Sequence, residues 1–379
     1  MLIQNGVILT GVQRKKCDIR ISEGKIVQVE ESLEALPEEE VVCAEGKFVA
    51  PGFLDIHTHG GMNVDVNGAS LEDFQTIGDF FASRGTTGWQ CSILTDTPEQ
   101  TISCIKQAVL YSKEPQNGAR LLGIHLEGPF LSQEYRGSMP THLIREKLDL
   151  DLLRRYQIEA EGLIRYITVS PELEGVVEGI PAMKELGITV AIGHSGADYD
   201  TAVKAIEMGA QAATHTMNAM LLLHQHRPAI TGAVLESDIY CEMICDGIHL
   251  HPGTVRLILK CKGNEKVVAV TDSIMAAGLP DGRYRLGVND VTVLNGDAKV
   301  TGTDIRAGST LTTDRALRNL VAFTGLPVER AIMLLTQNPA DLLNLCRKGR
   351  VEVGCDADLV ILDADLYVDQ VYVAGNRCR

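Results

Sequence analysis

Residues 51–60 read PGFLDIHTHG, and this stretch separates two kinds of sequence. Before it, short alternating runs and turns predict β-structure, with a hairpin where Ser22-Glu23-Gly24-Lys25 joins two such runs. After it, as far as about residue 345, apolar runs alternate with amphipathic stretches of helical period. Pro51 and Gly52 mark the change of character, as such residues often do at a boundary.

Eight apolar runs of strand length follow one another in the central region. Amphipathic stretches at 71–85, 98–113, 176–187, 198–209 and 251–263 separate most of them, and several end in glycine, a common helix C-cap. This rhythm predicts an α/β fold, a (β/α)8 barrel of the TIM type. A doubly wound open sheet is the alternative, weakened because no G-x-G-x-x-G motif follows an early strand. The runs are GFLDIHTH (52–59), TTGWQCSIL (86–94), LLGIHLEG (121–128), LIRYITVSPE (163–172), GITVAIGHS (187–195), AATHTMNAM (212–220), IYCEMICDG (239–247) and VVAVTDS (267–273).

The C-terminal end of the chain is β-rich again, with ADLVILDADL at 357–366 and VDQVYVAGN at 368–376. We expect it to join the N-terminal segment in one small sheet structure. The predicted domains are therefore a small β-domain of residues 1–50 and 346–379 and a catalytic barrel of residues 51–345.

Composition and charge exclude several classes of function. The net charge of -15 provides no basic excess for nucleic-acid binding. No apolar run approaches the roughly 20 residues of a membrane span. A secretory signal has a basic segment followed by an apolar one, and the first residues of this sequence do not show that pattern. Ten scattered cysteines without a C-x-x-C pair fit a reducing cytoplasm. We expect a cytoplasmic protein that binds neither nucleic acid nor a membrane.

Histidines and acids gather at the ends of the predicted strands, which form the active-site face of such a barrel. His57 and His59 have i,i+2 spacing, so a strand directs both imidazoles to one side, where they can chelate a metal. Each residue alone also fits a structural hydrogen bond. Together the set can hold one or two divalent ions with a position open for water. The polar residues at the strand ends are His57, His59, His125, Glu127, His194, His215, Asp246 and Asp272.

The order of several motifs resembles the amidohydrolase superfamily, and within it the N-acetylglucosamine-6-phosphate deacetylases. The resemblance covers essentially the whole chain. It implies a metal-bearing barrel with a small β-sandwich built from both termini, and a homodimer. The motifs are PGFLDIHTHG (51–60), GIHLEGPF (123–130), IGHSGAD (192–198), ATHTMNAM (213–220), ICDGIHLHP (244–252), VTDS (270–273) and AGSTLT (307–312).

The resemblance also implies roles for individual residues. Glu127, His194 and His215 would be the core metal ligands, and His57 with His59 would complete a second metal position. The implied cofactor is one or two divalent ions, Zn or Fe first, with Mn or Co as alternatives. Asp272 would be the general base and acid. Residues that would bind the substrate or close its pocket are Ser138, Asn218, Ala219, Gly247, His249, Arg306, Ala307 and Gly308.

Three positions depart from the pattern of these relatives. Where relatives carry a phosphate-binding arginine, this chain has His226, followed by Arg227. The residue before AGSTLT is Arg306 rather than an apolar residue, and Met139 replaces a frequent histidine. The phosphate end of the pocket is therefore rebuilt, and we expect Arg227 or Arg306 to reach the mouth of the cavity.

These observations lead to one expected reaction and several alternatives. We expect metal-dependent hydrolysis of N-acetylglucosamine 6-phosphate, a small amino-sugar substrate, to glucosamine 6-phosphate and acetate. The alternatives are N-acetylgalactosamine 6-phosphate or a non-phosphorylated N-acyl sugar as substrate. A cyclic-amide hydrolase is disfavoured because the fourth run has no lysine, and a deaminase because no glutamate adjoins His194. A non-catalytic assembly module is disfavoured because the candidate ligands are all present.

Overall fold

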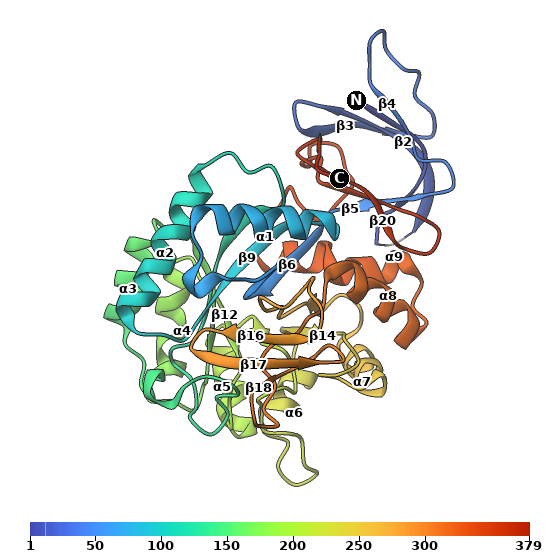
Figure 1. Ribbon diagram of the computed structural model, residues 1–379. Helices are drawn as coiled ribbons and strands as arrows, with labels where there is room; N and C mark the ends of the chain where they lie inside the picture. The colour runs from blue at the N-terminus through green and yellow to red at the C-terminus, as the bar shows by residue number, and fades with distance from the viewer. Residues whose placement is uncertain (12) are drawn as a thin grey trace.

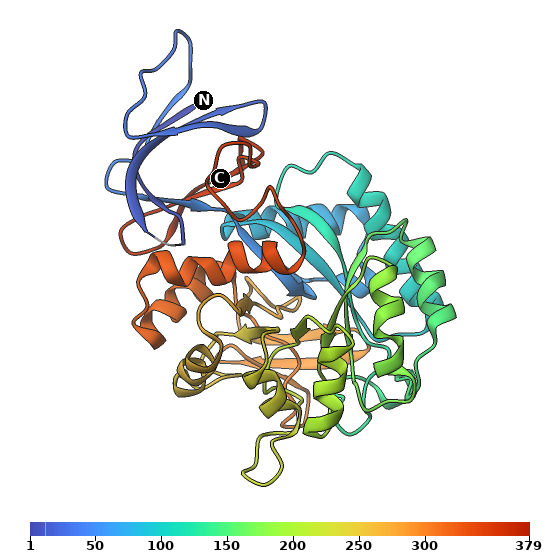
Figure 2. The ribbon, with the colours of Figure 1, turned by 180° about the vertical axis from the view of Figure 1, so that it is seen from behind.

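A barrel of eight parallel strands forms the centre of the computed structural model, which describes residues 1–11 and 13–379 (Figures 1 and 2). Every strand of the barrel overlaps one of the eight apolar runs, so the prediction of the (β/α)8 fold is confirmed. In order around the sheet, the strands are β6 (Phe53–Thr58), β9 (Thr86–Leu94), β10 (Arg120–Glu127), β11 (Ile164–Val169), β12 (Thr189–Ile192), β13 (Ala212–Ala213), β14 (Tyr240–Ile244) and β15 (Val267–Val270).

The first and last strands of the barrel meet just beyond their carboxyl ends. Thr58 and Ser273 form a parallel bridge. The Asp272 N–H donates to the His57 carbonyl over 2.8 Å, and the His59 N–H donates to the Ser273 carbonyl over 2.8 Å. We call residues His57–His59 and Asp272–Ser273 the closing seam. It places the predicted H-x-H pair beside the predicted catalytic acid.

Helices surround the barrel, as the alternating pattern predicts (Figures 1 and 2). Capping explains where they begin: Ser70 and Asp73 form a capping box at the first helix, and Thr97 caps the second, which has Pro98 in its first turn. The five helices expected from the sequence are present. The helices are α1 (Leu71–Ser83), α2 (Pro98–Lys113), α3 (Leu150–Glu159), α4 (Val176–Glu185), α5 (Tyr199–Glu207), α6 (Ala229–Glu236), α7 (Pro252–Lys262), α8 (Thr313–Thr324), α9 (Val328–Ala331) and α10 (Gln337–Leu342).

Both ends of the chain build one further sheet, which lies beside the barrel (Figure 1). Strand β5 (Phe48–Pro51) pairs with β19 (Leu359–Leu362), although the two strands lie near opposite ends of the sequence; Val49 is opposite Ile361. The predicted hairpin is present, and its turn residues Glu23 and Gly24 have φ values of 50° and 74°. The strands are β1 (Leu2–Leu9), β2 (Arg14–Ser22), β3 (Lys25–Glu30), β4 (Val41–Cys43), β5 (Phe48–Pro51), β19 (Leu359–Leu362), β20 (Val368–Val373) and β21 (Asn376–Arg377).

A small antiparallel sheet after β15 covers part of the catalytic face. It consists of β16 (Gly282–Leu286), β17 (Asn289–Leu294) and β18 (Asp297–Val300). Its apolar residues, such as Leu286 and Val291, pack on Leu131 and Met139 from the loop after β10. The insertion thus lies beside the ends of the barrel strands. A shorter pair, β7 (Gly60–Gly61) and β8 (Val64–Asp65), follows β6. Among the described residues, no helix combines the length and apolar character needed to cross a membrane.

Candidate metal centre and active site

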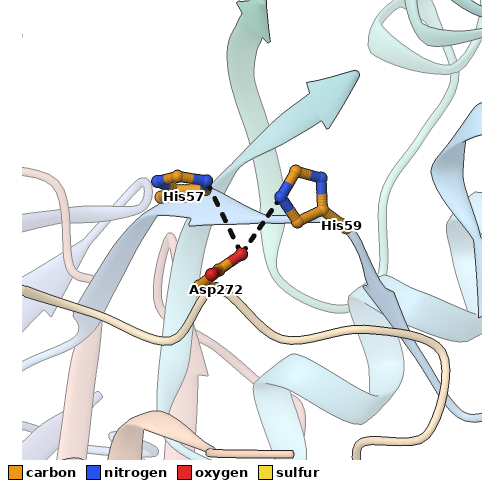
Figure 3. A group of neighbouring side chains, drawn as sticks. All are labelled: His57, His59 and Asp272. Atoms are coloured by element: carbon orange, nitrogen blue, oxygen red, sulfur yellow. Dashed lines mark ion pairs between the residues drawn. The ribbon is translucent and has the colours of Figure 1, made fainter. Parts of the chain in front are cut away.

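The first group of candidate metal ligands lies at the closing seam (Figure 3). His57 and His59 come from the end of β6, and Asp272 follows β15. The Asp272 Oδ1 atom lies 3.1 Å from Nε2 of His59 and 3.7 Å from Nε2 of His57. All three side chains are buried. Residues two apart on a strand point to the same face, so the H-x-H pair brings two imidazoles to one carboxylate.

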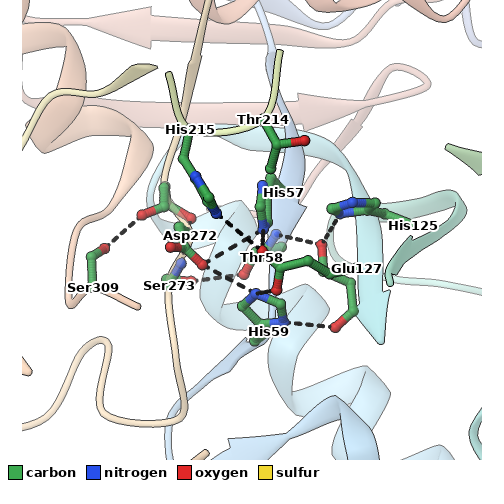
Figure 4. A network of polar contacts seen from close by, with 12 residues as sticks. His57, Thr58, His59, His125, Glu127, Thr214, His215, Asp272, Ser273 and Ser309 are labelled. Carbon is green, nitrogen blue, oxygen red and sulfur yellow. Dashed lines mark hydrogen bonds and ion pairs between the residues drawn. The ribbon is translucent and has the colours of Figure 1, made fainter. Parts of the chain in front are cut away.

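The second group consists of Glu127 at the end of β10, His194 after β12 and His215 after β13. The Glu127 Oε1 atom lies 3.1 Å from Nε2 of His194 and 3.2 Å from Nε2 of His215, and these two nitrogens are 3.0 Å apart. Glu127 also connects the groups. Its Oε1 lies 3.5 Å from Nε2 of His57, and its Oε2 lies 3.4 Å from Nε2 of His59 (Figure 4). The structure thus brings all five predicted ligands and Asp272 together.

Hydrogen bonds fix how the imidazoles are oriented. Three of the four rings place Nδ1 against an oxygen that can only accept, so Nδ1 carries a proton. In a neutral ring, Nε2 then presents its lone pair to the centre of the site. The pairs are His57 with Oε2 of Glu242 at 2.9 Å, His59 with the carbonyl of Ser92 at 2.8 Å, and His194 with the carbonyl of Tyr135 at 2.9 Å.

The electrostatic environment of the site favours positive charge at its centre. Burial lowers the pKa of His59, but its hydrogen bonds to Asp272 and Glu127 outweigh burial and raise the pKa to about 9. Burial raises the pKa of Glu127, but hydrogen bonds from the surrounding imidazoles, His194 first, hold it well below the usual range. The buried Nε2 of His57 has no hydrogen-bond partner within residues 1–11 and 13–379. Imidazole and carboxylate donors in this arrangement fit a divalent metal ion.

Asp272 is held in place by its backbone as well as by its neighbours. Its carbonyl accepts a hydrogen bond from the Ser309 N–H over 2.7 Å. Gly308 makes this approach possible: its φ is 61°, and a Cβ there would lie 2.8 Å from the Asp272 carbonyl oxygen and 2.5 Å from Cγ2 of Ile274. The glycine of AGSTLT therefore allows the chain to pass closely behind the predicted general base.

A cavity of about 470 Å³ opens beside the two ligand groups, a volume typical of small-molecule sites. Most of the residues predicted from the sequence line it. Apolar side chains from the inserted sheet and from the loop after β10, such as Leu286 and Met139, form part of its wall. The predicted residues that line the cavity are His59, Glu127, Ser138, His194, His215, Asn218, Ala219, His249, Asp272, Arg306 and Gly308.

Four residues predicted to bind the substrate do not line this cavity. His226 and Arg227 are in an exposed loop at 221–228 that projects beside α6 (Figure 1). A bridge between His224 and Arg227 closes this loop on itself, and none of its residues lines the cavity. Ala307 is fully buried, and its N–H donates to the carbonyl of Ala298. Gly247 adopts a φ of 80° in the turn before His249.

Asp246 orients one of the residues at the cavity. Its Oδ2 accepts a hydrogen bond from Nδ1 of His249 over 2.7 Å, and its Oδ1 accepts from the backbone N–H groups of Ile248 and His249. From the sequence, Asp246 is expected only as an acid at a strand end. Its spacing of three residues before His249 is the signal that indicates this positioning role.

The mouth of the cavity carries two arginines. Arg306 lines the cavity and pairs with Asp297 over 3.1 Å. Arg136, which is not among the residues expected from the sequence, also lines the cavity, and its guanidinium donates to the carbonyl of Gln133 over 2.8 Å. Within the described part of the chain, no carboxylate forms an ion pair with Arg136. Its charge is therefore available to an anionic ligand.

Comparisons with known proteins agree with this geometry. The model of the amidohydrolase family matches residues 48–378. The chain is 35% identical to N-acetylglucosamine-6-phosphate deacetylase of Bacillus subtilis (strain 168), with 99% of this chain and 94% of the relative covered. It is 31% identical to N-acetylgalactosamine-6-phosphate deacetylase of Escherichia coli O157:H7, with 94% and 93% covered.

The comparison with solved structures extends over the full length of the chain. A mutant of N-acetyl-D-glucosamine-6-phosphate deacetylase from Mycobacterium smegmatis, in complex with N-acetyl-D-glucosamine 6-phosphate, superposes with a TM-score of 0.94. The two proteins are 32% identical, and the alignment covers 100% of this chain and 99% of the other. Barrel, terminal sheet and inserted sheet thus belong to one shared architecture.

Proposed function

The chain belongs to the amidohydrolase family, and from this premise we propose that it hydrolyses the acetamide of N-acetylglucosamine 6-phosphate. The products are glucosamine 6-phosphate and acetate. One observation carries the proposal: Glu127 connects two histidine groups beside Asp272, at a cavity that fits a sugar phosphate. The roles given below to individual residues are part of the same proposal.

The proposed metal ligands are Glu127, His194 and His215 for one ion and His57 with His59 for a second. A divalent ion bound there supplies Lewis-acid polarisation of a carbonyl and makes water more acidic. The protein residues contribute the fixed geometry, because three of the four rings are oriented by hydrogen bonds of their own before an ion binds. We propose Zn²⁺ or Fe²⁺, since imidazole and carboxylate ligands suit both.

Asp272 serves first as base and then as acid in the proposed reaction. Its carboxylate takes one proton from the attacking water while the water oxygen bonds to the acyl carbon. It then gives this proton to the nitrogen as the C–N bond breaks, so that a neutral amine leaves together with acetic acid, which releases its remaining proton to solvent as acetate. One carboxylate is sufficient because the two transfers follow one another.

Residues on the loops after β13 and β14 would orient the amide. Asn218 lines the cavity, and its side-chain amide donates to the carbonyl of His215 over 3.1 Å, which fixes the side chain. Asp246 accepts from Nδ1 of His249, so the other ring nitrogen is available to the substrate. Ser138 and Ala219 complete this wall of the cavity.

Arg136 and Arg306 would bind the phosphate. Guanidinium groups suit phosphate because they donate two parallel charge-assisted hydrogen bonds. Arg306 would have to exchange its partner Asp297 for the ligand, whereas Arg136 would not have to leave a carboxylate. We therefore assign the larger share of phosphate binding to Arg136.

Acetate release from a panel of substrates tests the function. The panel contains N-acetylglucosamine 6-phosphate, N-acetylgalactosamine 6-phosphate and the two sugars without phosphate. We expect the first to be the best substrate by kcat/KM. A preference for the second would move the assignment to the activity of the Escherichia coli relative. No acetate from any of them, with metal fully bound, would refute a sugar deacetylase.

Two finer points are also proposals. We propose a homodimer, supported by the loop at 221–228, where three consecutive leucines are exposed by 37%, 58% and 55%. We propose a cytoplasmic location, supported by ten free cysteines. The domain boundaries at residues 50 and 346 likewise stay a prediction.

A further inference from the structure

Glu242 is a buried carboxylate that the proposed reaction does not use. It lies on β14, is fully buried, and is absent from the lining of the cavity, so it cannot touch the substrate. Its Oε1 atom has no hydrogen-bond partner within the described residues. A buried carboxylate that is only partly satisfied costs stability, and such a group calls for an explanation.

The other oxygen of Glu242 contacts both ligand groups. Oε2 lies 2.9 Å from Nδ1 of His57 and accepts the backbone N–H of His215 over 3.0 Å. His57 belongs to the group at the closing seam, and His215 to the group around Glu127. A single oxygen atom therefore connects two residues that are far apart in the sequence and that the site requires close together.

The contact with His57 selects the form of the ring that can bind a metal. A carboxylate oxygen only accepts, so the proton is on Nδ1 and the Nε2 lone pair faces Glu127 and Asp272. Without this acceptor, a neutral His57 could place its proton on Nε2 instead and lose its ability to coordinate. Histidine ligands of metal sites commonly have such a carboxylate partner.

The contact with His215 stabilises an unfavourable backbone. His215 has a φ of 28°, and Met217 and Ala219 beyond it also have positive φ. Glu242 holds the start of this turn at two successive N–H groups, because its side chain accepts from His215 and its carbonyl accepts from Thr216 over 2.9 Å. The direction in which the His215 side chain points, in the turn after β13, thus depends on Glu242.

We propose that Glu242 is a positioning residue that holds the two metal-ligand groups in a fixed position relative to each other. The proposal rests on the metal ligands assigned under the proposed function. It predicts that loss of the acceptor weakens both metal positions, and that the position at His57 is weakened more. That position loses its ring orientation, whereas His215 loses one backbone hydrogen bond.

Metal binding measures this role without any substrate, so failure here is distinct from failure of the deacetylase assignment. The apoprotein and its variants are titrated with Zn²⁺ against a chromophoric chelator, and the bound metal is counted by mass spectrometry. We expect Glu242→Leu to weaken Zn²⁺ binding by about 10–100-fold, the usual scale for a partner of a metal ligand. Glu242→Gln should bind Zn²⁺ much more tightly than Glu242→Leu, because its amide oxygen can still accept both hydrogen bonds.

Two further variants make the outcome decisive. Glu242→Asp keeps the charge but is one methylene shorter, so it cannot reach both donors and should lose metal even if the leucine variant does not fold. Met243→Leu changes the next residue of β14, whose side chain points to the opposite face, and should bind Zn²⁺ as the parent protein does. The proposal is wrong if the leucine or aspartate variant binds two equivalents with parental affinity. It is also wrong if Met243→Leu weakens binding to the same extent.

Discussion

The Nε2 atoms of His194 and His215 lie 3.0 Å apart, at hydrogen-bonding distance from the same oxygen of Glu127. Because Nδ1 of His194 donates to the carbonyl of Tyr135, Nε2 of the neutral His194 ring carries a lone pair that faces Nε2 of His215. A cation bound between these two nitrogens and Oε1 of Glu127 would be shared by both rings. The first prediction follows from this contact.

Removal of the metal should abolish turnover and lower thermal stability together. A ligand that binds only the folded state stabilises it by about 2.7 kcal/mol at a concentration 100-fold above its Kd. We expect the melting temperature to rise when Zn²⁺ is added back to chelator-treated protein, and acetate release to recover in parallel. Turnover that survives complete removal of metal, verified by elemental analysis, would contradict the metal-hydrolase assignment.

Glu127→Ala should remove metal and activity in one step. Glu127 faces all four of the imidazoles proposed to bind metal. Its loss would remove a ligand from the group of His194 and His215, and would also remove the contact that connects this group to His57 and His59. Elemental analysis of the purified variant checks the prediction. Glu172→Ala is the matched control, because that glutamate binds Ser195 outside the metal groups, and its loss should leave the metal content unchanged.

Asp272→Asn should lower kcat by about 10²–10⁴-fold while the metal at Glu127 is retained. Asparagine keeps the shape and the backbone hydrogen bonds at the closing seam, but it cannot carry a proton between water and the leaving nitrogen. Steady-state rates, with metal content measured on the same sample, distinguish this effect from metal loss. Near-parental turnover would assign the base elsewhere, with His249 as the next candidate.

Arg136→Ala should raise KM for the phosphorylated sugar by about 10–100-fold, the worth of hydrogen bonds to a charged group. The same variant should leave kinetics on unphosphorylated N-acetylglucosamine unchanged. Arg306→Ala should show the same selectivity with a smaller effect, since Asp297 already neutralises this guanidinium. If both variants affect the two substrates equally, neither arginine recognises phosphate.

Gly308→Ala should reduce both stability and turnover. The glycine has a φ of 61°, where alanine is strained, and a Cβ would overlap Ile274 and the carbonyl of Asp272. We expect a loss of about 1–3 kcal/mol in the free energy of unfolding, measured by chemical denaturation. Gly302→Ala is a useful comparison, because that glycine also has positive φ but its Cβ would meet open space.

The barrel could be predicted from the sequence because its strands are almost entirely buried and appear as predominantly apolar runs. The run at 212–220 is the exception in length. Its strand, β13, ends at Ala213, because His215, Met217 and Ala219 turn the chain through positive φ. The inserted sheet was not predicted, although the sequence carries a signal for it: Asn295-Gly296 forms the two-residue turn between the alternating residues of β17 and β18.

The site likewise contains residues that could be predicted from the sequence and residues that could not. The gathering of the proposed metal ligands was predictable because a barrel collects strand ends on one face, so position in the sequence fixes position in space. Glu242 was not, because a single acid within the apolar run IYCEMIC gives no sign of its partners. The positions of His226 and Arg227 were not predictable either, because residue spacing does not determine the direction in which a loop leaves the barrel.

The closing seam has a consequence for how the protein is made. Asp272 reaches the H-x-H pair only after more than 200 intervening residues have been synthesised and folded, and the bonds that close the barrel are those that assemble this part of the site. A ribosome-bound chain that lacks β15 has no complete group at the seam with which to capture an ion there. Pairing so distant in sequence is slow to form. Metal uptake at the proposed site in the seam would therefore be a late event that requires a finished barrel, and chains that stall before it would not acquire this metal.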